Sequence, residues 1–263
     1  MESVPELKPG CKGFCVLFRV PNAATDKVDK FFDGHQAFMR KTHPTSGTEE
    51  PVVISYHVMR SPELVNNLDP SQGTTGFTMY SMVEAYRSME GCAKHMELGQ
   101  KTGDLFKELV EMISAYCKVA LMFGGVIGTM EVAIQNINSS ITKGTMGFHG
   151  YFRATNDEEE TFLDKFIVEH TNFMNETHHI TGDTEPRLLY FAWSKTEELV
   201  NPVNPEEGKT GSKVYSLVEI YRGDAGCAAH MEAGQNSAIW SDFVKALSYS
   251  PGGIFGGTVV WTI

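Results

Sequence analysis

Two copies of one short segment carry the side chains that are best suited to acid–base chemistry. Residues 80–100 read YSMVEAYRSMEGCAKHMELGQ and residues 215–235 read YSLVEIYRGDAGCAAHMEAGQ, with fourteen of the twenty-one positions identical. Each copy places a glutamate eleven residues before a histidine: Glu84 before His95, and Glu219 before His230. Histidine suits a general base because its unperturbed pKa of about 6.5 lies near working pH. We therefore predict that these four residues are catalytic.

A cysteine precedes each of these histidines by three positions, as Cys92 and Cys227. Each pair would share one face of a helix. One interpretation is a Cys–His dyad or a site for a soft metal. The other is a small buried cysteine beside a hydrogen-bonded histidine. We favour the second, because two ligands without a nearby third are weak evidence for a metal, and we predict no metal site.

Two further histidine pairs recur at the same offset of 135 residues, His35 with His170 and His43 with His178. His35 and His170 fall on the apolar stripe of a predicted helix, where a core role and a pocket role both remain open. His43 and His178 lie near the end of that helix, where an imidazolium would gain from the helix dipole. All three histidines of one copy could also converge on a single pocket.

The segment at 77–87 alternates as a strand does, so its side chains point to two faces. If its small residues Ser81, Val83 and Ala85 lie under the helices, the face with the glutamate and tyrosines lines a cavity. An arginine could then pair with the glutamate, either beside a phenol-like ligand or in a buried ion pair. The predicted substrate-binding residues are Tyr80, Tyr86, Tyr215, Tyr221, His35, His170, Trp193, Arg19 and Arg153.

Composition excludes several classes of partner. The 263 residues carry a net charge of −11, so a phosphate backbone would be repelled and we expect no nucleic-acid partner. No apolar run reaches about 18 residues, so we expect no membrane span. The start of the chain lacks the basic and apolar regions of a secretory signal. Five cysteines without the spacing of a disulfide framework indicate reduced thiols, and we predict a cytoplasmic protein.

The repeat extends beyond these segments and predicts the domain organisation. The letters DKF at 29–31 recur at 164–166, and LVN at 64–66 recurs at 199–201. Units of this length far exceed solenoid repeats. We therefore predict two compact domains, residues 1–137 and 147–263, joined by a linker at 138–146.

Each copy is predicted to fold in the order β-α-β-β-α-α-β, from its apolar periodicity and turn residues. This is the order of a ferredoxin-like split βαβ unit with an extra helical segment, which covers one face of an antiparallel sheet with helices. The other face must also be covered, and the second copy can do so. We predict an α+β protein whose two tandem ferredoxin-like domains form a barrel with a cavity between the sheets.

The repeated motif also resembles a known family. VEAYR at 83–87 followed by GCAKH at 91–95, and VEIYR at 218–222 followed by GCAAH at 226–230, are similar to the antibiotic biosynthesis monooxygenase domain. That family includes quinol monooxygenases and has the dimeric α+β barrel fold. The resemblance implies that the duplication supplies both halves of the dimer in one chain. We expect a pseudo-dimeric monomer, and a further homodimer is possible.

The resemblance also implies an activity. Several relatives oxidise phenolic or quinol substrates with dioxygen and without metal or flavin, and others degrade haem or cyclise polyketides. Oxygenase relatives use an Asn–Trp pair, but Trp193 has only Val58 or Met59 near its place in the first copy. We predict a cofactor-independent monooxygenase-like protein acting on a small apolar or aromatic molecule in the barrel. The alternatives are a haem or other tetrapyrrole binder with a histidine ligand, and a non-catalytic small-molecule-binding or interaction module.

Overall fold

The computed structural model describes residues 5–134 and 137–263. Residues 1–4 and 135–136, which belong to the predicted first domain, lie outside the described residues. The first half contains β1 (Lys12–Pro21), α1 (Thr25–Thr42), β2 (Val53–Leu64), β3 (Thr74–Tyr86), α2 (Met89–Gln100), α3 (Asp104–Tyr116) and β4 (Cys117–Gly128). The second half contains β5 (Met146–Ala154), α5 (Asp157–Thr177), β6 (Leu188–Leu199), β7 (Lys209–Tyr221), α6 (Asp224–Gln235), α7 (Trp240–Leu247) and β8 (Ile254–Thr262). The predicted order β-α-β-β-α-α-β is therefore confirmed in both halves.

The helices form where apolar side chains recur every three or four residues. On α1, for example, Phe31, His35 and Met39 lie on one buried stripe. Helix α2 begins where the Ser88 hydroxyl accepts a hydrogen bond from the Gly91 N–H, which is the predicted N-cap. A short helix, α4 (Ile137–Ser140), lies in the predicted linker, and the domain bounds themselves stay a prediction. Among the described helices, none is long and apolar enough to cross a membrane.

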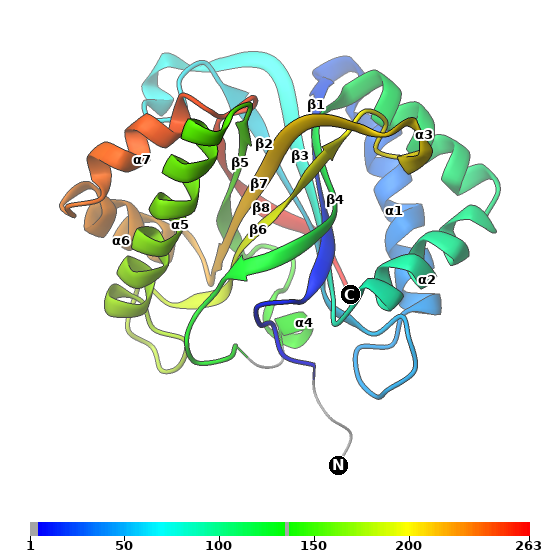
Figure 1. The fold of residues 1–263 in the computed structure, drawn as a ribbon, viewed down its shortest axis with the longest axis horizontal. Helices are drawn as coiled ribbons and strands as arrows, with labels where there is room; N and C mark the ends of the chain where they lie inside the picture. Colours follow the sequence, from blue (N-terminus) through cyan, green and yellow to red (C-terminus); the bar gives the residue numbers. More distant parts are fainter. Residues whose placement is uncertain (1–4, 135–136) are drawn as a thin grey trace.

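The eight strands form one closed antiparallel barrel in the order β1-β3-β2-β8-β5-β7-β6-β4. The two halves join at two seams, where β2 pairs with β8 and β4 pairs with β6. Figure 1 shows α1, α2 and α3 on one side of the strands and α5, α6 and α7 on the opposite side. The prediction of an α+β barrel closed within one chain is confirmed. Because each half supplies only part of the ring of strands, neither half has a closed sheet of its own.

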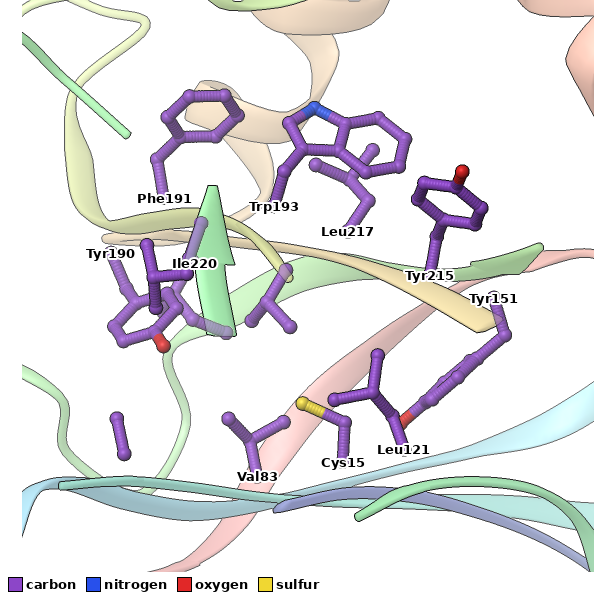
Figure 2. Close-up of a cluster of buried hydrophobic side chains, with 14 of the residues drawn as sticks. Cys15, Val83, Leu121, Tyr151, Tyr190, Phe191, Trp193, Tyr215, Leu217 and Ile220 are labelled. Carbon is purple, nitrogen blue, oxygen red and sulfur yellow. The ribbon is translucent and has the colours of Figure 1, made fainter. Parts of the chain in front are cut away.

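Side chains fill the interior of the barrel. Figure 2 shows Cys15, Val83 and Leu121 facing Tyr151 and Tyr190 across the space between the two strand layers. All five are buried. An eight-stranded barrel is just wide enough for side chains to fill it. The prediction of a substrate cavity between the sheets is therefore wrong.

The orientation predicted for the third strand of each copy is also wrong. Ser81 and Val83 point into the barrel, where the Ser81 hydroxyl lies 2.6 Å from the Tyr151 hydroxyl. Glu84 instead faces His35 of α1 and His95 of α2, on the helical side. The physical reason is packing across the barrel. The small side chains of β3 leave room for Tyr151 and His149, which reach the Ser81 hydroxyl from β5.

One side chain crosses from the second half into the first. Trp261 of β8 packs with its ring centroid 5.2 Å from that of Phe32, inside the buried cluster beneath α1. Its indole N–H donates a 2.8 Å hydrogen bond to the carboxylate of Asp33. The helical layer of the first half is therefore completed by the last strand of the chain.

We expect Trp261→Ala to lower the free energy of unfolding by about 3–5 kcal/mol, the usual cost of truncating a buried tryptophan. Urea denaturation followed by circular dichroism measures this change. The exposed Val65→Ala serves as a control and should change it by no more than about 0.5 kcal/mol. A loss below about 1 kcal/mol for the tryptophan variant would contradict its role in joining the halves.

Candidate functional site

Each half brings one glutamate and two histidines together between its sheet and its helices. In the first half, Glu84 lies on β3, His35 on α1 and His95 on α2. The equivalent residues of the second half, on β7, α5 and α6, are Glu219, His170 and His230. In both sets, one ligand-type atom of each residue lies within 4.8 Å of the other two. We name these sets the first trio and the second trio.

The carboxylate of the first trio is nearly out of contact with water, since Glu84 is 1% exposed. Its Oε1 lies 3.6 Å from His35 Nε2, and its Oε2 lies 3.5 Å from His95 Nδ1. Both distances exceed those of ordinary hydrogen bonds. Oε2 accepts a 2.6 Å hydrogen bond from the Tyr86 hydroxyl, whereas Oε1 has no hydrogen-bond partner among the described residues.

The second trio has similar distances, but His230 approaches its glutamate through Nε2, whereas His95 approaches through Nδ1. Glu219 is 1% exposed, with Oε1 lying 3.5 Å from His170 Nε2 and Oε2 lying 3.4 Å from His230 Nε2. The Tyr221 hydroxyl donates to Oε2 at 2.8 Å. Oε1 again has no hydrogen-bond partner among the described residues.

A chain of hydrogen bonds fixes which nitrogen of His230 carries a proton. The Thr177 hydroxyl donates its only proton to the Phe173 carbonyl, so it accepts from His178 Nδ1–H at 2.8 Å. Neutral His178 therefore accepts at Nε2, and His230 Nδ1–H donates to it at 3.0 Å. The remaining nitrogen of His230, Nε2, presents a lone pair towards Glu219. Glu219 Oε2, which already accepts from Tyr221, lies 3.4 Å from this lone pair, so the carboxylate would stabilise a proton placed on His230 Nε2.

The first half repeats this chain. Thr42 donates to the Phe38 carbonyl and accepts from His43 Nδ1–H at 2.8 Å. His43 Nε2 then accepts from His95 Nδ1–H at 3.0 Å. The proton of neutral His95 is therefore engaged at Nδ1, and its Nε2 keeps a lone pair.

The two halves differ at the first histidine of each trio. His35 Nδ1 lies 3.1 Å from the Tyr56 hydroxyl, which can either donate or accept. His170 Nδ1 instead accepts a 3.1 Å hydrogen bond from the indole N–H of Trp193, which can only donate. The proton of neutral His170 is therefore confined to Nε2, whereas that of His35 can occupy either nitrogen.

Burial dominates the protonation of the glutamates and histidines. Desolvation raises the pKa of Glu84 and of Glu219, and the nearby histidine and tyrosine lower it only in part. Desolvation also lowers the pKa of His178 to about 3 and that of His170 well below 6.5, with neighbouring histidines adding to the effect. Both of these histidines are neutral at pH 7. The prediction that His178 gains as an imidazolium at a helix end is wrong.

A small apolar cavity adjoins each trio. The one at the second trio has a volume of about 30 Å³, and the one at the first trio about 20 Å³. A water molecule needs roughly 10–15 Å³ on this measure, so the larger cavity has room for about two or three water molecules and the smaller for about one or two. Residues lining the larger cavity include His170, Glu219, His230, Phe173, Trp240 and Phe243. Residues lining the smaller one include His35, His95, Phe31, Phe38, Leu105 and Leu109.

Of the predicted catalytic and substrate-binding residues, the structure brings Glu84, His35, His95 and Tyr86 together in the first half. It brings Glu219, His170, His230 and Tyr221 together in the second. Of the three histidines of each copy, two line the cavity, and the third, His43 or His178, lies behind them and accepts a hydrogen bond from His95 or His230. The other predicted residues lie outside the trios.

The arginines do not reach the buried glutamates. Arg19 pairs with Glu63 and Arg153 with Glu198, near the barrel rim. Arg87 pairs with Glu50 and Arg222 with Glu185. Those side chains remain partly exposed and keep their charges in water, so the predicted arginine–glutamate pair in the cavity is wrong.

Two tyrosines and Trp193 also have roles other than those predicted. The Tyr80 hydroxyl donates to Asp29, and the Tyr215 hydroxyl donates to Asp164. Figure 2 shows Trp193 and Tyr215 on the face of β6 and β7 that points away from the barrel interior. Trp193 is fully buried, and its one polar atom contacts His170. It therefore orients a histidine and does not line the cavity.

The cysteines lie near the trios but are not members of them. Desolvation raises the pKa of the Cys227 thiol to about 12, and it raises the pKa of Cys92 as well. A protonated thiol is a poor nucleophile and a poor metal ligand. This favours the buried structural interpretation over a Cys–His dyad.

Sequence reasoning missed Tyr56 and underestimated His43 and His178. The recurrence of both histidines at offset 135, each directly after a threonine, was the available signal. Tyr56 gave no such signal, because Phe191 replaces it in the second copy.

Comparison with known proteins gives distant structural neighbours. No protein-family model and no curated protein matches the chain. A provisionally named monooxygenase from Lactobacillus acidophilus is 10% identical, with 95% of this chain and 93% of that chain covered and a TM-score of 0.44. A provisionally named monooxygenase from Fusobacterium nucleatum is 8% identical, with coverages of 97% and 93% and a TM-score of 0.49.

A haem-binding protein from Thermus thermophilus is 8% identical, with coverages of 97% and 94% and a TM-score of 0.36. All three TM-scores lie below 0.5. The assignment of function therefore rests on the geometry of the site.

We expect the free energy of unfolding to fall steeply as the pH drops below 6.5. Burial lowers the pKa of His57 and His178 to about 3, and that of His149 and His170 well below 6.5. The unfolded chain takes up protons below 6.5 that the folded chain refuses, so each histidine costs up to about 1.4 kcal/mol per pH unit. The raised pKa of Glu84 and Glu219 opposes this loss of stability, because on acidification these two carboxylates take up protons in the folded chain before the unfolded chain does. The glutamates are fewer than the histidines, so the net effect of acidification is destabilising.

Urea denaturation at pH 7.5 and pH 5.5 measures this dependence. His149→Phe should reduce the slope, because one such group is removed. A free energy of unfolding that stays constant or rises on acidification would contradict the neutral state of these histidines.

Proposed function

We propose that the chain is a cofactor-independent, monooxygenase-like oxidoreductase that acts on a small aromatic, quinol or polyketide-like molecule at the second trio. One observation carries the proposal. The lone pair of His230 Nε2 faces Glu219 Oε2 at 3.4 Å, so a basic nitrogen lies against a buried carboxylate beside an apolar cavity. Titratable groups arranged in this way are typical of acid–base sites.

The pair can remove a proton from a substrate hydroxyl. His230 Nε2 has a free lone pair that can accept the proton, and Glu219 would stabilise the imidazolium that forms. The resulting phenolate is electron-rich and reacts with dioxygen. One oxygen atom enters the quinol, and the other leaves as water with the two hydrogens that the quinol loses. His178 and Thr177 hold the His230 ring in place during the transfer.

The cavity must widen to admit such a substrate, since its volume of about 30 Å³ has room for only about two or three water molecules. Met231 of α6 and Trp240 of α7 line it from the helical side, and both are only partly buried. We expect the substrate to enter by outward movement of these two helices, as lids do in many enzymes. The proposed site thus lies between sheet and helices, and not inside the barrel.

The fold fits this proposal. The closed barrel and the repeated element order support two ferredoxin-like halves, arranged like the two subunits of a dimeric α+β barrel of the antibiotic biosynthesis monooxygenase type. A filled barrel would favour the non-catalytic alternative, but the cavities beneath the helices offer sites elsewhere. A tetrapyrrole bound through a histidine stays a prediction, and a shifted Soret band during haemin titration would support it.

We expect oxygen uptake when the protein is incubated in air with quinols or anthrone-like compounds. Glu219→Gln should lower kcat by about 10²–10⁴-fold, because proton transfer by a placed side chain contributes about that much. Oxygen-electrode traces and product absorbance measure both effects.

The matched control is Glu198→Gln, which makes the same change in the same half at a residue paired with Arg153. It should retain the activity of the unchanged protein. The same substitution at Glu84 should cost much less than that at Glu219. No turnover with either class of compound, or full activity in Glu219→Gln, would refute the proposal.

A further inference from the structure

We propose that the second trio holds the hydroxyl group of a phenol-like ligand at two points, with His170 Nε2–H as the donor and His230 Nε2 as the acceptor. Trp193 is the positioning residue that fixes the donor. The choice of this site rests on the proposed function. The assignment adds a role for His170, which proton removal by His230 does not itself require.

The proton of His170 is placed by a group that cannot accept one. The Trp193 indole N–H donates to His170 Nδ1 at 3.1 Å, and both side chains are buried. An indole only donates, so Nδ1 must accept, and the neutral ring carries its proton on Nε2. The opposite tautomer would set two buried N–H groups against each other and leave both unpaired, which is costly.

The Nε2–H of His170 has no close acceptor in the trio. Glu219 Oε1 lies 3.5 Å from His170 Nε2, beyond the range of an ordinary hydrogen bond. This oxygen is itself buried and has no hydrogen-bond partner among the described residues. A ligand oxygen beside both groups would accept from the N–H, and its own hydrogen would have acceptors close by.

The acceptor is fixed in the opposite sense. His230 Nδ1–H donates to His178 Nε2 at 3.0 Å, which leaves the lone pair of His230 on Nε2. One ring nitrogen of His170 lies within 4.8 Å of one ring nitrogen of His230, and both rings line the same cavity. An oxygen with hydrogen bonds of about 2.9 Å to two nitrogens can bridge up to about 5.8 Å. The spacing therefore suits one hydroxyl oxygen that accepts from His170 and donates to His230.

The other walls of the cavity favour an apolar body on that hydroxyl. They include Phe148, Phe173, Leu217 and Phe243, which offer aromatic and aliphatic contacts. An aromatic ring needs more room than about 30 Å³, so it enters only with the helix movement that the proposed function already requires. A hydroxyl carried on an aromatic ring matches both the polar pair and these walls.

The first trio does not offer the same pair. His95 places Nδ1 near Glu84, and that nitrogen carries the proton donated to His43, so its lone pair lies on the other nitrogen. The proton of His35 can occupy either nitrogen, because the Tyr56 hydroxyl both donates and accepts. Neither histidine is thus fixed in the sense that the clamp needs, and we expect one such site per chain.

Nuclear magnetic resonance of protein labelled with ¹⁵N-histidine reads the two protons directly. Long-range ¹H–¹⁵N correlation spectra at pH 7.5 should show His170 protonated at Nε2 and His230 protonated at Nδ1. Trp193→Phe should give His170 a mixture of both tautomers, a change that a purely packing role of the indole would not cause. The matched control Tyr56→Phe should leave the His170 signals unchanged. An unchanged protein with His170 protonated at Nδ1 overturns the proposal.

Calorimetry under argon with phenol and anisole tests the clamp. Anisole keeps the ring and the oxygen but cannot donate, so it should bind about 5–150-fold more weakly than phenol, the factor expected for an unpaired buried polar group. His170→Leu should reduce this preference for phenol, whereas a change in packing alone would weaken both ligands alike. Tyr56→Phe should keep the preference. Absence of phenol binding, equal binding of both compounds, or two equal phenol sites per chain overturns the proposal.

The two experiments separate this clamp from the oxygenase activity, because argon removes dioxygen and the spectra need no ligand. One phenol site with the expected preference but no oxygen uptake in air would refute the activity and keep the clamp. Oxygen uptake together with equal binding of phenol and anisole would do the reverse. If His170→Leu fails to fold, the tautomer of His170 and the phenol preference in the unchanged protein still decide the outcome.

Discussion

A carboxylate withdrawn from water lies at the centre of each half, and the other features of the two sites follow from its charge. Isolating an ionised carboxylate costs several kcal/mol unless a proton or a cation compensates it. One tyrosine hydroxyl reaches each carboxylate, and that single hydrogen bond leaves Oε1 without a partner. Among the histidines nearest to the two carboxylates, burial lowers the pKa of His35, His95 and His170 and so favours their neutral state. Each site therefore lacks a positive charge that would balance its glutamate in the ionised state.

The identity of one hydrogen-bond partner decides where the proton of the first histidine lies in each half. An indole only donates, so Trp193 assigns the proton of His170 to Nε2. A hydroxyl both donates and accepts, so Tyr56 leaves the proton of His35 free to occupy either nitrogen. Nearly identical backbones can thus hold equivalent histidines in different proton arrangements.

The sequence was sufficient to predict the repeat, the order of elements and most members of the trios. The periodicity of α1 placed His35 on its buried stripe, and the duplicated segment singled out Glu84 and His95. The prediction that failed was which face of β3 points towards the helices. Alternation along β3 separates Ser81 and Val83 from Glu84, but it does not say which set faces the helices. That choice depends on the width of the barrel, which is a property of all eight strands together.

The role of Trp193 could not be read from sequence for a related reason. A tryptophan near a predicted cavity suggests a substrate contact, yet the indole N–H meets His170 across the gap between β6 and α5. The contact joins residues that are distant in the chain and has no counterpart at Val58. The only available signal was that Trp193 and its aligned residue Val58 differ. That difference becomes informative only once His170 is known to face Trp193.

The closed barrel makes the two sites thermodynamically dependent on each other even though their chemistry is separate. Neither half closes its own sheet, and Trp261 from the last strand completes the core beneath α1. Loss of one half therefore exposes strand edges and apolar surface in the other. A ligand present at 100 times its Kd stabilises the folded state by about 2.7 kcal/mol. A ligand bound at the second trio would thus stabilise the strands that hold Glu84 without contacting them.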